Sequence, residues 1–70
     1  MITVRERVTV FLLERPLRNY CDACLARALG IDPSTAYRAA TRLTSVTRFA
    51  REYAMCSECG ASRLITRSVA

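Results

Sequence analysis

The sequence predicts an α+β fold, mainly α, in which a three-helix core is followed by a two-stranded β-hairpin. Apolar residues recur at helical spacing in three segments before residue 46, and a period of two begins at Phe49. Four cysteines stand in two C-x-x-C pairs. A chain of 70 residues has room for one domain, residues 1–70, whose core is too small to be stable without a further staple.

The first segment predicts a helix over about residues 4–15. Thr3 and Glu6 have the spacing of a capping box, and Pro16 cannot continue the helix. Val10 and Leu13 fall on the side of the helix away from the core. We expect these apolar side chains to be covered either by a second copy of the chain in a homodimer or by residues 64–69. The face directed toward the core is apolar and consists of Val4, Val8, Phe11 and Leu12.

The second segment predicts a short helix over residues 21–29, with an inward face formed by Leu25, Ala28 and Leu29. Gly30 follows in the position that favours glycine after a helix. A third helix is expected to begin near Pro33, with Asp32 or Ser34 as its cap, and to run to about Ser45.

The third helix shows the clearest separation of two faces in the chain. Its inward face is small and apolar and consists of Ala36, Ala39, Ala40 and Leu43. Its outward face is polar and consists of Ser34, Arg38, Thr41, Arg42 and Ser45.

A hairpin is predicted after the third helix. Residues 49–55 alternate with a period of two, C-S-E-C-G makes the turn, and the β-branched residues of S-R-L-I-T-R-S-V favour a return strand over residues 62–69. The order helix, helix, turn, helix, hairpin resembles a winged helix-turn-helix domain, in which the hairpin is the wing.

The two C-x-x-C pairs predict one metal site with the ligands Cys21, Cys24, Cys56 and Cys59. Each pair offers two soft sulfur donors at a tight turn, and in a chain without histidine a Cys₄ site with one structural Zn²⁺ is the simple outcome. The pairs are farther apart than the roughly 15–20 residues of a simple Cys₄ ribbon. The metal is therefore expected to tie the start of the second helix to the tip of the hairpin. Iron in the same site, disulfides, a dithiol redox centre and unligated cysteines are the alternatives.

The charge balance favours an acidic partner. The 11 basic residues are all arginine and stand against 6 acids, for a net charge of +5. Arginines on the third helix are either ordinary surface residues or contacts to the major groove, and Arg67 beside the hairpin either reaches phosphate or protects a sheet edge. Tyr20 and Tyr37 are expected to pack in the fold rather than to stack on bases. The residues predicted to contact DNA are Ser34, Arg38, Thr41, Arg42, Ser45, Arg51 and Arg63.

The sequence predicts neither catalysis nor a membrane segment. It contains no histidine or lysine to act as a base and no phosphate-binding glycine loop, and four cysteines on one zinc leave no position for water. Charges interrupt the apolar residues among the first 16, no cleavage site follows, and no apolar run approaches about 18 residues. We therefore expect a cytoplasmic protein with no small-molecule substrate.

From about residue 20 to 67 the chain resembles small bacterial zinc-binding winged helix-turn-helix proteins. The resemblance is carried by Y-C-D-A-C-L-A-R-A-L-G-I, P-S-T-A-Y-R-A-A-T-R-L and F-A-R-E-Y-A-M-C-S-E-C-G. It implies that the four cysteines are the metal ligands and that the third helix is a recognition helix. We expect a zinc-stabilised DNA-binding module with a role in transcription regulation or as an accessory to a larger nucleic-acid machine. The alternative is a non-catalytic protein-protein interaction module with the same fold.

Overall fold

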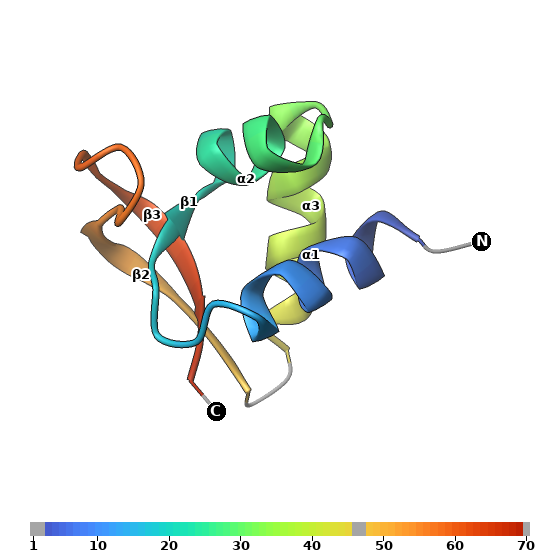
Figure 1. The fold of residues 1–70 in the computed structure, drawn as a ribbon, viewed down its shortest axis with the longest axis horizontal. Coiled ribbons are helices and arrows are strands. Elements are labelled where there is room, and N and C mark those ends of the chain that lie inside the picture. Colours follow the sequence, from blue (N-terminus) through green and yellow to red (C-terminus); the bar gives the residue numbers. More distant parts are fainter. Residues whose placement is uncertain (1–2, 46–47, 70) are drawn as a thin grey trace.

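The computed structural model describes residues 3–45 and 48–69 and has two layers, three helices on one side and an antiparallel sheet on the other (Figure 1). The predicted α+β class with three helices is confirmed. The sheet has three strands in the order β1-β3-β2, one more than the predicted hairpin. The elements are α1 (Val4–Leu13), β1 (Tyr20–Cys21), α2 (Asp22–Leu29), α3 (Pro33–Leu43), β2 (Phe49–Met55) and β3 (Ser62–Ser68).

Helix α1 begins at the predicted capping box. The backbone N–H of Glu6 donates to Oγ1 of Thr3 at 3.1 Å, and the N–H of Thr3 donates to Oε1 of Glu6 at 3.5 Å. The helix ends at Leu13, two residues before the predicted end, because the N–H of Arg15 turns back to the carbonyl of Leu12 at 3.1 Å in the approach to proline. Val8 and Leu12 are buried in the core, as predicted.

Helix α2 ends at Gly30, which takes the left-handed conformation (φ +67°) that the sequence predicted. The N–H of Ile31 then donates to the carbonyl of Ala26 at 2.9 Å and closes the end of the helix. Leu25 is buried as predicted, but Ala28 is exposed and Ala26 is buried. The prediction for Ala28 was wrong because this residue borders an open pocket between α1 and α2 instead of touching the core.

Asp32, one of the two predicted caps, occupies the N-cap position of helix α3, but its side chain makes no capping hydrogen bond, and Pro33 lies in the first turn. It ends at Leu43, two residues before the predicted end. The predicted faces are confirmed. The four apolar residues of the inward face are buried, and the outward residues Ser34, Arg38, Thr41, Arg42 and Ser45 are exposed.

Strands β2 and β3 form the predicted hairpin, paired from Phe49↔Ser68 to Met55↔Ser62. The short strand β1 adds to the other edge of β3, with Tyr20 opposite Thr66. Two residues are too few for any periodic signal, so the sequence did not predict β1. None of the helices within residues 3–45 and 48–69 has the length and apolar character that a membrane span needs.

Candidate metal centre

The fold brings all four cysteines into one cluster between the start of α2 and the β2–β3 turn. Their sulfur atoms lie within 4.8 Å of one another, with 3.7 Å between Cys24 and Cys56 and 3.9 Å between Cys21 and Cys59. The start of the second helix and the turn of the hairpin thus lie together, as a shared metal ion would require. Three of the cysteines are buried and Cys59 is exposed.

The sulfur positions fit a tetrahedral metal site. With metal–sulfur bonds of about 2.3 Å, the sulfurs of a regular tetrahedron lie about 3.8 Å apart. The two short sulfur–sulfur distances, 3.7 and 3.9 Å, lie on either side of that value. Both far exceed the roughly 2.05 Å of a disulfide bond, and the cysteines are free thiols. The cluster could therefore hold a metal ion.

The first pair is positioned by the junction of β1 and α2. Cys21 is the last residue of β1 and the N-cap of α2, and Cys24 lies in the first turn of that helix. Pairing with Ile65 fixes the backbone of Cys21 against the central strand. The N–H of Cys21 points at the sulfur of Cys56 at 3.4 Å, so one pair is already joined to the other through a backbone donor.

The second pair lies in a tight turn that other residues hold closed. The N–H of Cys56 donates to the carbonyl of Ala61, and the N–H of Gly60 donates to the carbonyl of Cys56, both at 2.9 Å. Gly60, the last residue of the C-S-E-C-G turn, has φ +75°, a conformation that favours glycine.

Asn19 attaches the link before β1 to the same turn, and sequence reasoning missed it. Its carbonyl accepts from the N–H of Ser57 at 2.8 Å, and its own N–H donates to Oγ of Ser57 at 3.0 Å. Its Nδ2 donates to the carbonyl of Met55 at 3.0 Å. These hydrogen bonds hold the segment before the first C-x-x-C pair against the turn that contains the second pair. A single asparagine outside any helix or strand has no periodic pattern, so these hydrogen bonds could not be predicted from the sequence.

A largely buried ion pair beside the cluster was also missed, and it corrects one predicted DNA contact. The guanidinium of Arg51 donates to both carboxylate oxygens of Asp22, at 3.0 and 2.8 Å, and to Oγ1 of Thr66 at 2.7 Å. The side chains of Arg51 and Asp22 are only 9% and 19% exposed. Arg51 is therefore not free to reach phosphate, because its position on β2 faces the acid in the first turn of α2.

The environments of the thiols differ within the cluster. Burial raises the pKa of Cys24 and Cys21, and for Cys24 hydrogen bonds with the other cysteines raise the pKa further. Burial opposes ionisation of Cys56 as well, but the backbone N–H groups of Cys59, Cys21 and Glu58 outweigh it and lower the pKa of Cys56 to about 6. Cys56 is thus the thiol best prepared to bind a cation as a thiolate.

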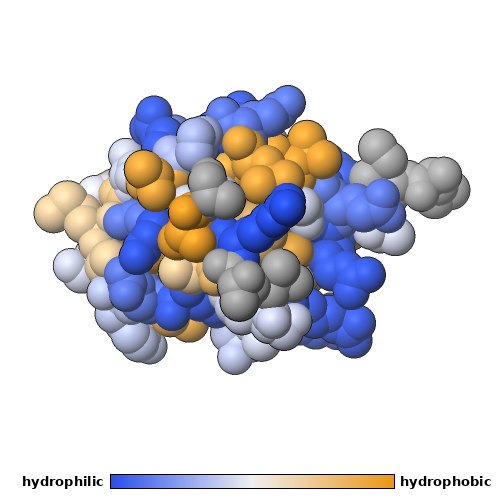
Figure 2. Space-filling model, turned by 90° about the horizontal axis from the view of Figure 1, so that it is seen from below, coloured by the Kyte–Doolittle hydropathy of each residue, from blue (hydrophilic) through white to orange (hydrophobic). Residues whose placement is uncertain are grey.

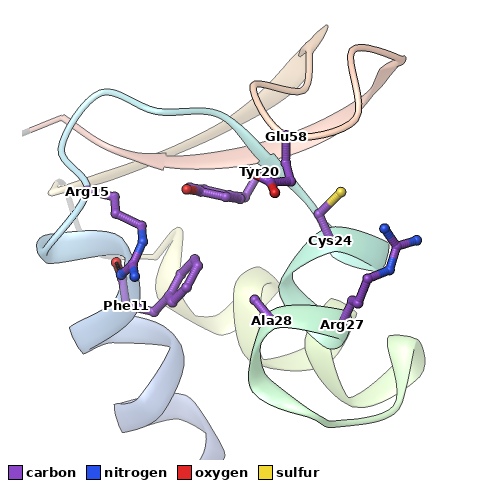
Figure 3. Close-up of a pocket in the computed structure, with 7 residues that line it drawn as sticks. All are labelled: Phe11, Arg15, Tyr20, Cys24, Arg27, Ala28 and Glu58. Atoms are coloured by element: carbon purple, nitrogen blue, oxygen red, sulfur yellow. Dashed lines mark hydrogen bonds between the residues drawn. The ribbon is translucent and has the colours of Figure 1, made fainter.

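A pocket of about 270 Å³ opens beside the cluster, between α1, β1, α2 and the hairpin turn (Figure 3). The ring of Tyr20 meets the ring of Phe11 edge to face, with 5.0 Å between centroids, and the guanidinium of Arg15 lies 3.9 Å over Phe11. Tyr20 therefore packs in the fold, as predicted. Cys24 and Glu58 form the wall of the pocket toward the cysteine cluster.

The other predicted DNA contacts lie away from the cysteine cluster. The five outward residues of α3 are exposed together on that helix, whereas Arg63 is exposed on β3. Arg67, also on β3, forms an ion pair with Glu52 at 2.7 Å. Tyr37 is exposed on α3, with the Arg51 guanidinium 5.2 Å from its ring centre.

Comparisons with known proteins identify no relative of this chain. No protein-family model, no curated protein and no solved structure matches it. A function must therefore be inferred from the structure itself, that is, from the four clustered sulfur atoms at the start of α2 and the β2–β3 turn and from the exposed charges of the helices.

Proposed function

We propose that the chain is a zinc-stabilised DNA-binding module with a winged helix-turn-helix fold. Four soft sulfur donors within 4.8 Å of one another suit Zn²⁺, which is the usual ion of closed Cys₄ sites, and iron is the alternative. Zinc held by all four cysteines would join α2 to the β2–β3 turn. Its role would be structural, because no coordination position is left for water or substrate.

One observation supports DNA binding above the others: α3 presents a polar, cationic face opposite its buried one. Gly30 separates α2 from α3 by a short turn, which is the arrangement of a helix-turn-helix. Arg38 and Arg42 are exposed on α3, and neither forms an ion pair with an acid within residues 3–45 and 48–69. Small serine and threonine side chains beside them let the helix approach a groove closely.

The proposed activity is regulatory or accessory rather than catalytic. The chain has no histidine or lysine to act as a general base. The most economical role is a small module that recognises DNA and holds its shape with zinc.

The test is a salt titration of DNA binding by the zinc-loaded chain and by Arg38→Ala/Arg42→Ala. The double variant should fold normally, because each exposed substitution changes stability by no more than about 0.5 kcal/mol. If both arginines contact phosphate, the slope of log affinity against log salt should fall by about two units. The control is Arg18→Ala/Arg27→Ala, which removes the same charge from exposed positions outside α3. Equal affinities and slopes for the two double variants would overturn DNA binding through α3.

A second candidate, a protein-interaction module, is favoured by the exposed side chains of β2. Tyr53 is 81% exposed and Met55 is 64% exposed, and β2 is an edge strand of the sheet. An edge strand with exposed apolar side chains can pair with an extended segment of another chain. A zinc-loaded chain that binds neither duplex nor single-stranded DNA at low salt would put this candidate first.

A further inference from the structure

We propose that Arg5, in the first turn of α1, joins Arg38 and Arg42 of α3 in a single surface that binds the phosphates of duplex DNA. We call these three residues the arginine surface. The proposal rests on the proposed function and goes beyond it, because it places the second DNA contact on α1 and not on the hairpin wing.

Arg5 of α1 and Arg42 of α3 border the same two grooves, and Arg38 borders one of them. One groove, of about 280 Å³, is lined by Arg5, Arg38 and Arg42 together with small side chains of both helices. The second, of about 230 Å³, is lined by Thr3, Arg5 and Arg42. Arg5 and Arg42 therefore stand side by side although they are far apart in the sequence. Sequence reasoning did not include Arg5, because its position depends on how α1 packs against α3.

The guanidinium groups of the arginine surface are not held in ion pairs within the described residues. None of its three arginines forms an ion pair there, whereas Glu14, Asp22 and Glu52 each pair with an arginine elsewhere. Glu6, the acid nearest to Arg5 in sequence, is hydrogen-bonded in the capping box of α1. Figure 2 shows hydrophilic side chains gathered at the right-hand end of the molecule, where the N-terminal turn of α1 lies in Figure 1.

The hairpin offers fewer free cations than a wing that contacts DNA would need. The guanidinium of Arg51 is held by Asp22, and that of Arg67 is held by Glu52. Arg63 is exposed on β3 without an ion pair in the described part of the chain. The arginine surface therefore offers three arginines without an ion pair, whereas β2 and β3 offer only Arg63 within the described residues, and this difference favours an electrostatic contact through α1 and α3.

Duplex DNA fits this surface better than a free anion does. The three arginines are exposed, and the grooves beside them are shallow, so no enclosed set of donors surrounds a single phosphate. A row of phosphates gives each separated guanidinium its own partner and releases condensed counterions, which makes exposed cations effective on DNA. The serine and threonine side chains of α3 next to Arg38 and Arg42 can then meet base edges.

The experiment compares single arginine variants of the zinc-loaded chain on one mixed-sequence duplex. Arg5→Ala should lower affinity about eightfold at about 0.1 M salt and reduce the salt slope by about one unit, as expected for the loss of one phosphate contact. Arg5→Lys keeps the charge and should restore the slope. Arg63→Ala tests the hairpin, and Arg18→Ala controls for net charge, so both should leave the slope within experimental error of the parent. Thermal melting of every variant confirms that it is folded.

The outcomes separate this proposal from the proposed function. One outcome would overturn the arginine surface and leave α3 as the contact. In that outcome the parent binds DNA, Arg38→Ala/Arg42→Ala lowers the affinity for DNA, and Arg5→Ala has the same affinity and salt slope as Arg18→Ala. If Arg63→Ala reduces the slope and Arg5→Ala does not, the wing is the second contact. If the parent binds anionic phospholipid vesicles but no duplex, both the function and the arginine surface are overturned.

Discussion

Breaking the ion pair between Arg51 and Asp22 should destabilise the domain far more than breaking an exposed pair in the same sheet. Arg51→Ala leaves the carboxylate of Asp22 and the hydroxyl of Thr66 without their shared donor. Loss of one partner from a buried pair costs about 3–5 kcal/mol. Asp22 keeps 19% of its side-chain surface in solvent, so water recovers part of that cost and about 3 kcal/mol is expected.

The assay is urea unfolding of the zinc-loaded parent and variants at one fixed excess of zinc, because metal binding contributes to the measured stability. Arg67→Ala is the matched control, since it breaks a pair of similar length whose partners are 25% and 53% exposed, and it should cost no more than about 1 kcal/mol. Arg51→Met combined with Asp22→Leu should recover most of the loss, because it leaves no buried charge. If Arg51→Ala and Arg67→Ala lowered the free energy of unfolding by the same small amount, burial of the Arg51–Asp22 pair would not be what makes it important for stability.

Three further predictions concern the turn, the thiols and α1. Gly60→Ala should lower the free energy of unfolding by about 1–2 kcal/mol in the same urea assay, because an added Cβ meets nothing within 4 Å and only the left-handed backbone is strained. A decrease of more than about 4 kcal/mol would contradict this prediction. Zinc affinity, measured by competition with a chelating dye, should fall as the pH is lowered toward the pKa of Cys56, which is about 6. Protons compete with zinc for the cysteine sulfurs, and the thiols with a raised pKa, Cys21 and Cys24, take up protons first. An affinity independent of pH would exclude thiolate ligation. A dimer of this chain should use the exposed Val10 and Leu13 of α1, so Leu13→Glu should sediment as a monomer, and an unchanged dimer would exclude this surface.

The helices, the hairpin and the cysteine cluster could be predicted because each leaves a local pattern in the sequence. The apolar period of α3 placed its buried alanines, and Gly30 marked a position of positive φ at the end of α2. The cysteine spacing was informative because two C-x-x-C pairs separated by two helices must meet if they share one ion.

The features that escaped prediction depend on contacts between distant segments. Strand β1 exists because Tyr20 pairs with Thr66, and its two residues leave no period of their own. Arg51 has the sequence appearance of an exposed strand residue, and only the approach of α2 to the sheet gives it Asp22 as a partner. Arg5 and Arg42 likewise line one groove only because α1 packs beside α3.

The central claim, that four cysteines hold one structural zinc ion, is tested most directly by metal analysis joined to X-ray absorption on the purified chain. We predict one zinc per chain with four sulfur neighbours at about 2.3 Å, and cooperative loss of the near-ultraviolet circular dichroism signal when a chelator removes the ion. A chain that contains no metal, keeps that signal and still melts cooperatively would contradict the claim.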